Sequence, residues 1–149
     1  MKLAIASDHG GYQLKNSILQ LLSSRKIEYV DLGVANGDSV DYPDYAAQVA
    51  ERVASGQVDG GILVCGTGIG MAITANKFKG VRAAVVTDPY TAQMSKEHNN
   101  ANVIAVGGRV VDETKAMETV KAWLDAEYQA GRHARRLEKI AEIEKKNFK

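Results

Sequence analysis

Residues 58–78 read VDGGILVCGTGIGMAITANKF and contain Cys65, the single cysteine of this 149-residue chain. The run GILVC is typical of a buried β-strand, and the glycines after it are typical of a turn into a helix. A helix N-terminus points backbone N–H groups at a ligand and favours negative charge, so the turn is suited to an anion and to a Cys65 thiolate. We therefore interpret this stretch as a reaction site.

Strand-like and helix-like segments alternate on both sides of this stretch. The expected strands cover residues 3–7, 27–33, 61–65, 81–87 and 102–107, and the expected helices cover 12–24, 42–55, 69–79, 89–97, 112–129 and 132–147. Parallel strands need crossover connections, and apolar runs without strict alternation suit strands that are covered on both faces. The pattern predicts one domain over residues 1–149, a Rossmann-like three-layer α/β/α sandwich with a five-stranded parallel sheet and an extra C-terminal helix.

The two helices expected at the end of the chain differ in their apolar pattern. The helix over 112–129 should pack on the sheet through residues at helical spacing, which are Met117, Val120, Trp123, Leu124 and Tyr128. Gly131 is expected to end it. The helix over 132–147 has only a narrow apolar stripe, formed by Leu137, Ile140, Ala141 and Ile143. Such a stripe could pack against a neighbouring subunit.

Composition excludes several classes of protein. A formal net charge of +1 carries no overall electrostatic signature of a nucleic-acid or membrane partner. One cysteine cannot form an intramolecular disulfide framework or a multi-cysteine zinc site. No apolar stretch is long enough to span a bilayer, and the apolar run at the start reaches Asp8 too soon for a signal peptide. We expect a cytoplasmic protein.

The loops expected at one edge of the sheet carry most of the candidate residues. In open α/β sheets, ligands bind beyond the carboxyl ends of the strands. The segments that follow the strands are Asp8-His9-Gly10-Gly11, Asp41-Tyr42-Pro43, Cys65 through Gly70, Thr87-Asp88-Pro89 and Gly107-Gly108-Arg109. We expect these loops to converge on one crevice. The glycine loop matches neither the dinucleotide nor the P-loop pattern, so it favours a small oxyanion over a nucleotide.

The charged candidates each have a structural alternative. Asp8 is either a ligand-binding acid or an N-cap. His9 and His98 are expected at the ligand end, where either could act as an acid or a base, whereas His133 is expected to be a surface or capping residue. Arg132 and Arg136 are four residues apart on one helix face, which suits a phosphate dianion and equally suits a solvated run of charges.

Together, several motifs strongly resemble those of the ribose-5-phosphate isomerase type B family, which also contains galactose-6-phosphate isomerase subunits and allose-6-phosphate isomerases. The motifs are DHGG at 8–11, DYPDYA at 41–46, VDGGILVCGTGIG at 58–70, ANKF at 75–78, EHNNANVIAVGGR at 97–109 and GRH at 131–133. The resemblance runs nearly end to end. It implies aldose-ketose isomerisation of a sugar phosphate through a cis-enediolate, as in the pentose phosphate pathway, with neither a metal nor another cofactor.

The same resemblance implies which residues carry the reaction. Cys65 resembles the base that moves the carbon-bound proton, and Thr67 resembles the hydroxyl that assists proton movement between O1 and O2. His98 would open the furanose ring. The N–H groups that would hold the enediolate belong to Gly66, Thr67, Gly68, Ile69 and Gly70.

The resemblance also implies the substrate contacts. Asp8 would lie near the opening ring, and Tyr42 and Asn99 would contact sugar hydroxyls. The residues that resemble phosphate ligands are His9, Arg132 and Arg136, with Arg109 a weaker candidate; Arg135, beside the pair, adds a third charge and leaves the assignment among the arginines open. In the family these groups come from two subunits, so we expect a homodimer or a dimer of dimers with shared active sites.

The chain carries both halves of this site, which favours ribose 5-phosphate over galactose 6-phosphate. Three other interpretations stay open at this point. They are an isomerase of a six-carbon sugar phosphate such as allose 6-phosphate, a non-catalytic sugar-phosphate binding module, and thiol-based redox or hydrolytic chemistry at Cys65. The last is disfavoured because the chain has no second cysteine to resolve an oxidised one.

Overall fold

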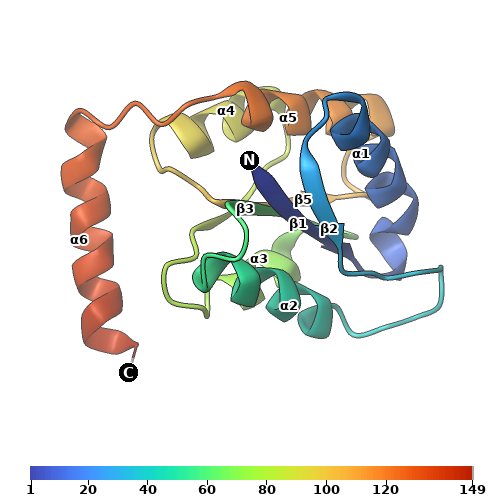
Figure 1. The fold of residues 1–149 in the computed structure, drawn as a ribbon, viewed down its shortest axis with the longest axis horizontal. Coiled ribbons are helices and arrows are strands. Elements are labelled where there is room, and N and C mark those ends of the chain that lie inside the picture. The colour runs from blue at the N-terminus through green and yellow to red at the C-terminus, as the bar shows by residue number, and fades with distance from the viewer. Residues whose placement is uncertain (149) are drawn as a thin grey trace.

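In the computed structural model, which describes residues 1–148, five parallel strands form one sheet in the order β2-β1-β3-β5-β4 (Figure 1). The strands are β1 (Lys2–Ser7), β2 (Glu28–Asp31), β3 (Gly60–Cys65), β4 (Ala83–Val85) and β5 (Val103–Gly107). The helices between and after them are α1 (Tyr12–Ser24), α2 (Tyr42–Ala54), α3 (Ile69–Ala75), α4 (Pro89–Glu97), α5 (Glu113–Asp125) and α6 (Arg132–Asn147). The predicted α/β fold class is confirmed.

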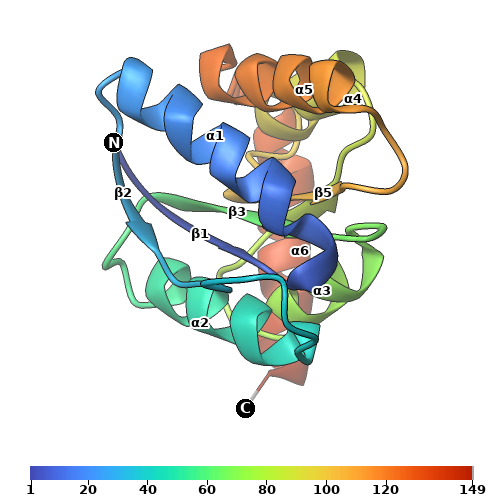
Figure 2. The ribbon, with the colours of Figure 1, turned by 90° about the vertical axis from the view of Figure 1, so that its right-hand side faces the viewer.

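Helices cover both faces of the sheet, as the continuous apolar runs of the strands require (Figure 2). One core is built from α1, α4 and α5 against residues such as Ile5, Ile62 and Ile104. The other is built from α2 and α3 against the alternate residues of the same strands, such as Ala4 and Leu63. Trp123 is 1% exposed in the first core and its indole N–H donates to the carbonyl of Ala101, so the prediction that it is a core residue is confirmed.

The strand order places β3 in the middle of the sheet. β3 pairs with β1 on one side, where Val64 lies opposite Ser7, and with β5 on the other, where Cys65 lies opposite Gly107. The chain leaves β3 through α3 for the edge strand β4 and returns through α4 to β5. Cys65 therefore ends the central strand, with the segments after β1 and β5 on its two sides.

Two predicted helices are too long. The helix predicted over 69–79 ends at Ala75, because Asn76 instead exchanges two hydrogen bonds with the backbone of Ala83 at the start of β4 (2.9 and 2.8 Å). The helix predicted over 112–129 ends at Asp125, where the backbone of Ala126 is extended. Tyr128 therefore lies outside it, and Gly131, at φ +50°, is the N-cap of α6 and not the end of α5.

Helix α6 stands at one side of the α/β sandwich, away from α1 and α2 (Figure 1). The two isoleucines of its apolar stripe are exposed, Ile140 (49%) and Ile143 (61%). Both line a hollow of about 440 Å³ between α6 and the edge strand β4, together with Val81, Ala83 and Phe148. Within residues 1–148, no helix has both the length and the apolar character needed to cross a membrane.

Candidate active site

Cys65 lies at the carboxyl end of the central strand and is 5% exposed. Its Sγ accepts a hydrogen bond from the backbone N–H of Gly68 at 3.1 Å. The turn after β3 therefore places a backbone N–H donor directly against the sulfur of Cys65.

Two glycines let this turn fold tightly over the end of the sheet. Gly68 has a φ of +81°, a conformation that is costly for residues with a Cβ atom. Gly107 lies against the turn from β5, where an added Cβ atom would come within 2.7 Å of the carbonyl carbon of Thr67. The loop from Cys65 to Gly70 is thus seated directly on the backbone of β5.

Thr67 is exposed at the top of this turn. Its Oγ1 accepts a hydrogen bond from the N–H of Ile69 at 3.2 Å, so the hydroxyl keeps its own proton for another acceptor. Two N–H groups that sequence analysis assigned to an oxyanion hole, those of Gly68 and Ile69, are therefore directed at Cys65 and Thr67 within the loop itself.

An open pocket of about 460 Å³ lies over Cys65, and four of the five predicted segments contribute residues to its lining. Its lining residues are Asp8, Tyr42, Cys65, Gly66, Thr67, Ile69, Gly70, Ile73 and Arg109. The predicted convergence of the loops after β1, β3 and β5, and of the residues that begin α2, is confirmed. Thr87 and Pro89 do not line it, because they follow the edge strand β4, and Asp88 between them caps α4 by accepting from Thr91 N–H at 2.7 Å.

Arg109 brings a fixed positive charge to this pocket. Its backbone N–H donates to the carbonyl of Gly66 at 3.0 Å, which ties the β5 loop to the cysteine loop. Its guanidinium lies beside Gly10 and Gly66, since Cβ atoms added there would be 3.4 and 3.3 Å from its Nη atoms. The absence of side chains at both glycines makes room for this cation beside Cys65.

Asp8 and His9 follow β1 next to the cysteine loop. The N–H of Asp8 donates to the carbonyl of Val64 at 3.1 Å, and its Oδ1 accepts from the N–H of Gly11 at 3.1 Å to cap the short 3-10 turn η1 (His9–Gly11). Asp8 is thus an N-cap and also lines the pocket. The Nδ1 of His9 accepts from the N–H of Val40 at 3.3 Å in the β2–α2 loop.

Tyr42 begins α2 and lies over the first turn of α3. A Cβ atom added to Gly70 would be 2.4 Å from its ring, so the ring packs directly on that glycine's backbone. The phenol is 40% exposed and lines the pocket beside Cys65. A hydroxyl from a second element therefore faces the same space as the thiol.

A second group of candidate residues lies at the opposite edge of the sheet. His98 caps the C-terminus of α4, and Asn99 follows it before β5. Because α4 starts at the carboxyl end of β4 and runs back along the sheet, the C-terminus of α4 lies at the amino edge. The expectation that His98 lies with His9 at the ligand end of the chain is wrong for this reason. Arg132 and Arg136 are near it on the first turns of α6.

The imidazole rings of His98 and His133 are stacked, with centroids 4.1 Å apart and planes at 16°. His133 is 8% exposed, so the expectation of a surface residue is also wrong. Burial lowers the pKa of His133, and the nearby positive charges of His98, Arg132 and Arg136 lower this pKa further. Sequence analysis missed this contact because the two histidines are 35 positions apart and no local pattern joins them.

Lys15 is the other residue that sequence analysis missed. It is 1% exposed although it carries a charge, and it contacts the loop that follows β2. The available signal was its spacing, since it lies three and seven positions before Ile18 and Leu22 on the buried face of α1. Among residues 1–148, no three His, Cys, Asp or Glu side chains are close enough together to hold a metal ion.

The fold and the pocket define a class of protein, an α/β protein that places a thiol, a hydroxyl and a guanidinium around a small open site at the carboxyl edge of its sheet. The chain belongs to the Ribose/Galactose Isomerase family, whose model matches residues 3–140.

Individual relatives cover nearly all of the chain. The chain is 50% identical to "Ribose-5-phosphate isomerase B" of Escherichia coli (strain K12) over 97% of both chains. It superposes on the structure of Clostridium thermocellum ribose-5-phosphate isomerase B with a TM-score of 0.96, at 55% identity and over 98% and 99% of the two chains. It superposes on the Mycoplasma genitalium enzyme with bound ribulose-5-phosphate with a TM-score of 0.95, at 42% identity and over 98% and 97%.

Proposed function

We propose that this chain interconverts ribose 5-phosphate and ribulose 5-phosphate by proton transfer. The observation that carries the proposal is the geometry of Cys65, a buried sulfur that faces an open pocket and accepts an N–H bond from its own glycine turn. The ribulose-5-phosphate in a relative that matches this chain end to end supports the choice of substrate. No other cysteine competes for the role, because the chain has one.

In the proposed reaction, Cys65 removes the proton from C2 of the opened aldose and returns it to C1. The hydroxyl of Thr67 donates to the enediolate and passes a proton between O1 and O2, because its oxygen is already held by the N–H of Ile69. The N–H groups left to stabilise the oxyanion are those of Gly66, Thr67 and Gly70, since those of Gly68 and Ile69 are engaged within the loop. The positive charge of Arg109 adds to this stabilisation of the oxyanion.

Substrate binding is proposed to use both edges of the molecule. Asp8, Tyr42 and Arg109 would contact the sugar from the pocket that they line. His9 would bind the phosphate. The residues at the other edge, His98, Asn99, Arg132 and Arg136, would reach the pocket of a second copy, where His98 opens the ring and the arginines grip the phosphate.

Three features support this shared site. The pocket is open on one side, and two side chains on that side are exposed, Ile69 (54%) and Ile73 (57%). The apolar stripe of α6 is exposed over a hollow that nothing in this chain fills within residues 1–148. A homodimer, alone or paired into a tetramer, would cover both surfaces. The cytoplasmic location and the single domain over 1–149 remain predictions.

The assay that tests the function follows ketose formation by the purified protein from ribose 5-phosphate, allose 6-phosphate and galactose 6-phosphate in turn, without added metal. We expect ribose 5-phosphate to have the highest kcat/KM. Solvent deuterium should enter the sugar at the position that receives the proton, which distinguishes proton transfer from a hydride shift. Binding of all three without turnover would instead identify a sugar-phosphate binding module, and highest activity on a six-carbon sugar would reassign the substrate.

A further inference from the structure

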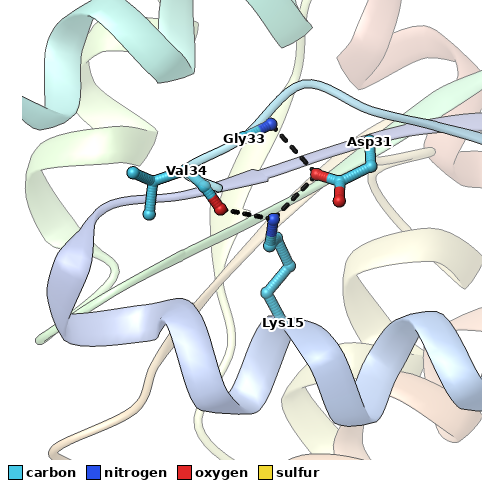
Figure 3. Close-up of polar contacts among 4 residues, drawn as sticks. All are labelled: Lys15, Asp31, Gly33 and Val34. Carbon is cyan, nitrogen blue, oxygen red and sulfur yellow. Dashed lines mark hydrogen bonds and ion pairs between the residues drawn. The ribbon is translucent and has the colours of Figure 1, made fainter. Parts of the chain in front are cut away.

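The buried cation Lys15 lies outside the pocket and takes no part in the proposed reaction, yet it contacts the loop whose far end leads to Tyr42 in the pocket lining. Its Nζ donates to Oδ1 of Asp31 and to the carbonyl of Val34, each at 2.8 Å (Figure 3). The same Oδ1 accepts from the N–H of Gly33 at 3.0 Å. One ammonium thus joins α1 to the end of β2 and to the first residues of the loop after it.

Burying the ammonium of Lys15 costs free energy, so its contacts point to a specific role for the charge. The side chain of Lys15 is 1% exposed, whereas that of its partner Asp31 is 37% exposed. Removing an ammonium from water carries a penalty that a single half-solvated carboxylate offsets only in part. An apolar residue at this point of α1 would pack beside Ile18 and Leu22 without that penalty. What the ammonium adds is a directed bond to the loop backbone.

The loop between β2 and α2 has few other anchors in its middle. At its start, Leu32, Gly33 and Val34 exchange hydrogen bonds with the backbone of β1. Residues 35–39 are all exposed. The next contact with the body of the protein is the bond from the N–H of Val40 to Nδ1 of His9, after which Tyr42 packs on Gly70. The position of Val34 therefore sets where the exposed segment starts, and Val40 is where it returns.

The Val40 bond fixes the state of the His9 ring. An Nδ1 atom that accepts a hydrogen bond carries no proton, so a neutral ring with this bond carries its proton on Nε2. That tautomer presents an N–H donor on the side of the ring away from the loop. A phosphate oxygen needs such a donor. If Val40 moved, the ring would be free to adopt the other tautomer, and the Nε2–H donor would be lost.

We infer that Lys15 is a positioning residue for phosphate binding: by holding Val34 and Asp31 it places Val40 against His9 and thereby keeps the Nε2–H tautomer of that ring. The inference rests on the proposed function for the identity of the phosphate compound. The contacts of Lys15 with Asp31 and Val34, and of Val40 with His9, do not depend on the proposed function.

The test compares three variants with a matched control. Lys15→Met keeps the length and apolar stem of the side chain but removes both donated bonds. Asp31→Ala removes one acceptor from the same ammonium while leaving the buried face of α1 intact, and Asp31→Asn restores an Oδ1 acceptor. Asp125→Ala breaks an ion pair of α1, the 2.6 Å bond from Arg25, at a place remote from the loop.

The first readout is the ring nitrogen spectrum of His9, recorded at a pH of about 8 so that imidazoles are neutral, and assigned with His9→Gln. The wild-type chain should show an unprotonated Nδ1 and a protonated Nε2. Lys15→Met should show a mixture of tautomers, with a smaller change in the same direction for Asp31→Ala. Asp31→Asn and Asp125→Ala should both match the wild type. This readout does not depend on any isomerase activity.

The second readout is the split between KM and kcat on ribose 5-phosphate. Loss of one charge-assisted hydrogen bond to phosphate should raise KM about tenfold in Lys15→Met, with kcat within about twofold of wild type. A purely structural ion pair would lower the melting temperature and leave the tautomer and KM unchanged, and that result in a folded Lys15→Met would overturn the inference. If Lys15→Met does not fold, a wild-type spectrum and KM in Asp31→Ala would overturn it.

An inactive wild type with the expected spectra would refute the proposed function and not the positioning role. In that case the same variants are compared for the response of the His9 ring signals to inorganic phosphate. Weaker phosphate affinity in Lys15→Met than in Asp125→Ala is then the expected result, and equal affinity would contradict it.

Discussion

The two edges of the sheet carry candidate residues of the same kinds but are built in different ways. At the carboxyl edge, backbone hydrogen bonds join the loop that carries Cys65 to the loop that carries Arg109, and both residues share one pocket with Thr67. At the amino edge, His98 and His133 stack on each other at the junction of α4 and α6, and neither lines the pocket over Cys65. One edge gathers a thiol, a hydroxyl and a guanidinium in one pocket, whereas the histidines of the other edge do not line that pocket.

The residues that we propose for the active site are therefore not brought together within one chain. The two groups lie at opposite ends of strands that are five or six residues long in the centre of the sheet, so no side-chain movement could join them. A second copy of the chain removes the difficulty, because it can present its amino edge to the first copy's carboxyl edge.

The largest effect is expected from the thiol at the carboxyl edge. Cys65→Ala should lower kcat on ribose 5-phosphate by about 10²–10⁴-fold, the range of general acid-base catalysis, because nothing else in the pocket lies at the end of β3 to take the proton. The assay is ketose formation, with the melting temperature as a check on folding. Full activity in Cys65→Ala would retain the reaction and discard the base.

A somewhat smaller loss is expected when the loop is moved and its side chains are kept. Gly107→Ala puts a Cβ atom 2.7 Å from the carbonyl carbon of Thr67, so the turn must shift. A displacement of about 1 Å can cost about 10²-fold in rate, and we expect a loss of that order in kcat/KM. Gly37→Ala is the control, since an added Cβ atom there has open space around it. Equal activity in the two variants would show that the seating of the loop on β5 is unimportant.

The combination of the two edges is tested by mixing inactive variants. Cys65→Ala and His98→Ala are expected to be inactive alone; after unfolding and refolding together, half of the dimers should be mixed. Each mixed dimer has one intact site if the site is shared, so activity should return to about a quarter of the wild-type value.

The matched control mixes Cys65→Ala with Thr67→Ala, whose lesions lie in the same pocket. Every site then keeps one lesion, and no activity should return. Recovery in both mixtures, or in neither, would contradict a site shared between two copies. Light scattering of the wild type after size exclusion should give a dimer or a tetramer, and a fully active monomer would exclude sharing outright.

The smallest effect concerns the stability of the amino edge. The pKa of His133 is lowered from its ordinary value of 6.5, first by burial and then by the charges of His98, Arg132 and Arg136. The unfolded chain therefore binds this proton more readily than the folded one, so stability falls as the pH drops through 6.5 towards the folded pKa.

The measurement is the melting temperature between about pH 5 and pH 8, a range that covers histidine titration. His133→Phe keeps a ring to stack on His98 but cannot be protonated, so its loss of stability at acid pH should be smaller than that of the wild type. Gly37→Ala, which adds a Cβ atom in open space and changes no titratable group, should keep the wild-type slope. An unchanged slope in His133→Phe would show that the histidine stack does not contribute to the pH dependence.

Much of the fold and of the carboxyl edge could be predicted from the chain itself. The bounds of α1, α4 and α6 agree with the sequence pattern, because apolar spacing and the capping box of α4 act between residues close together in the chain. The errors occurred where a distant partner outweighs local preference. Asn76 bonds to β4 and ends α3 early, and the backbone of Gln129 donates to Glu97, so the segment before α6 follows α4 and not the axis of α5.

The placement of Cys65 at the end of a buried strand before a glycine turn follows from the local sequence, since both the apolar run and the glycines act through the backbone of adjacent residues. The stacking of His98 on His133 at the far edge and the burial of Lys15 against Val34 arise from tertiary packing alone. These contacts depend on the crossover that inserts β5 between β3 and β4, and on the way α1 packs over the β2 loop. Such contacts join residues far apart in the chain, and no local periodicity encodes them.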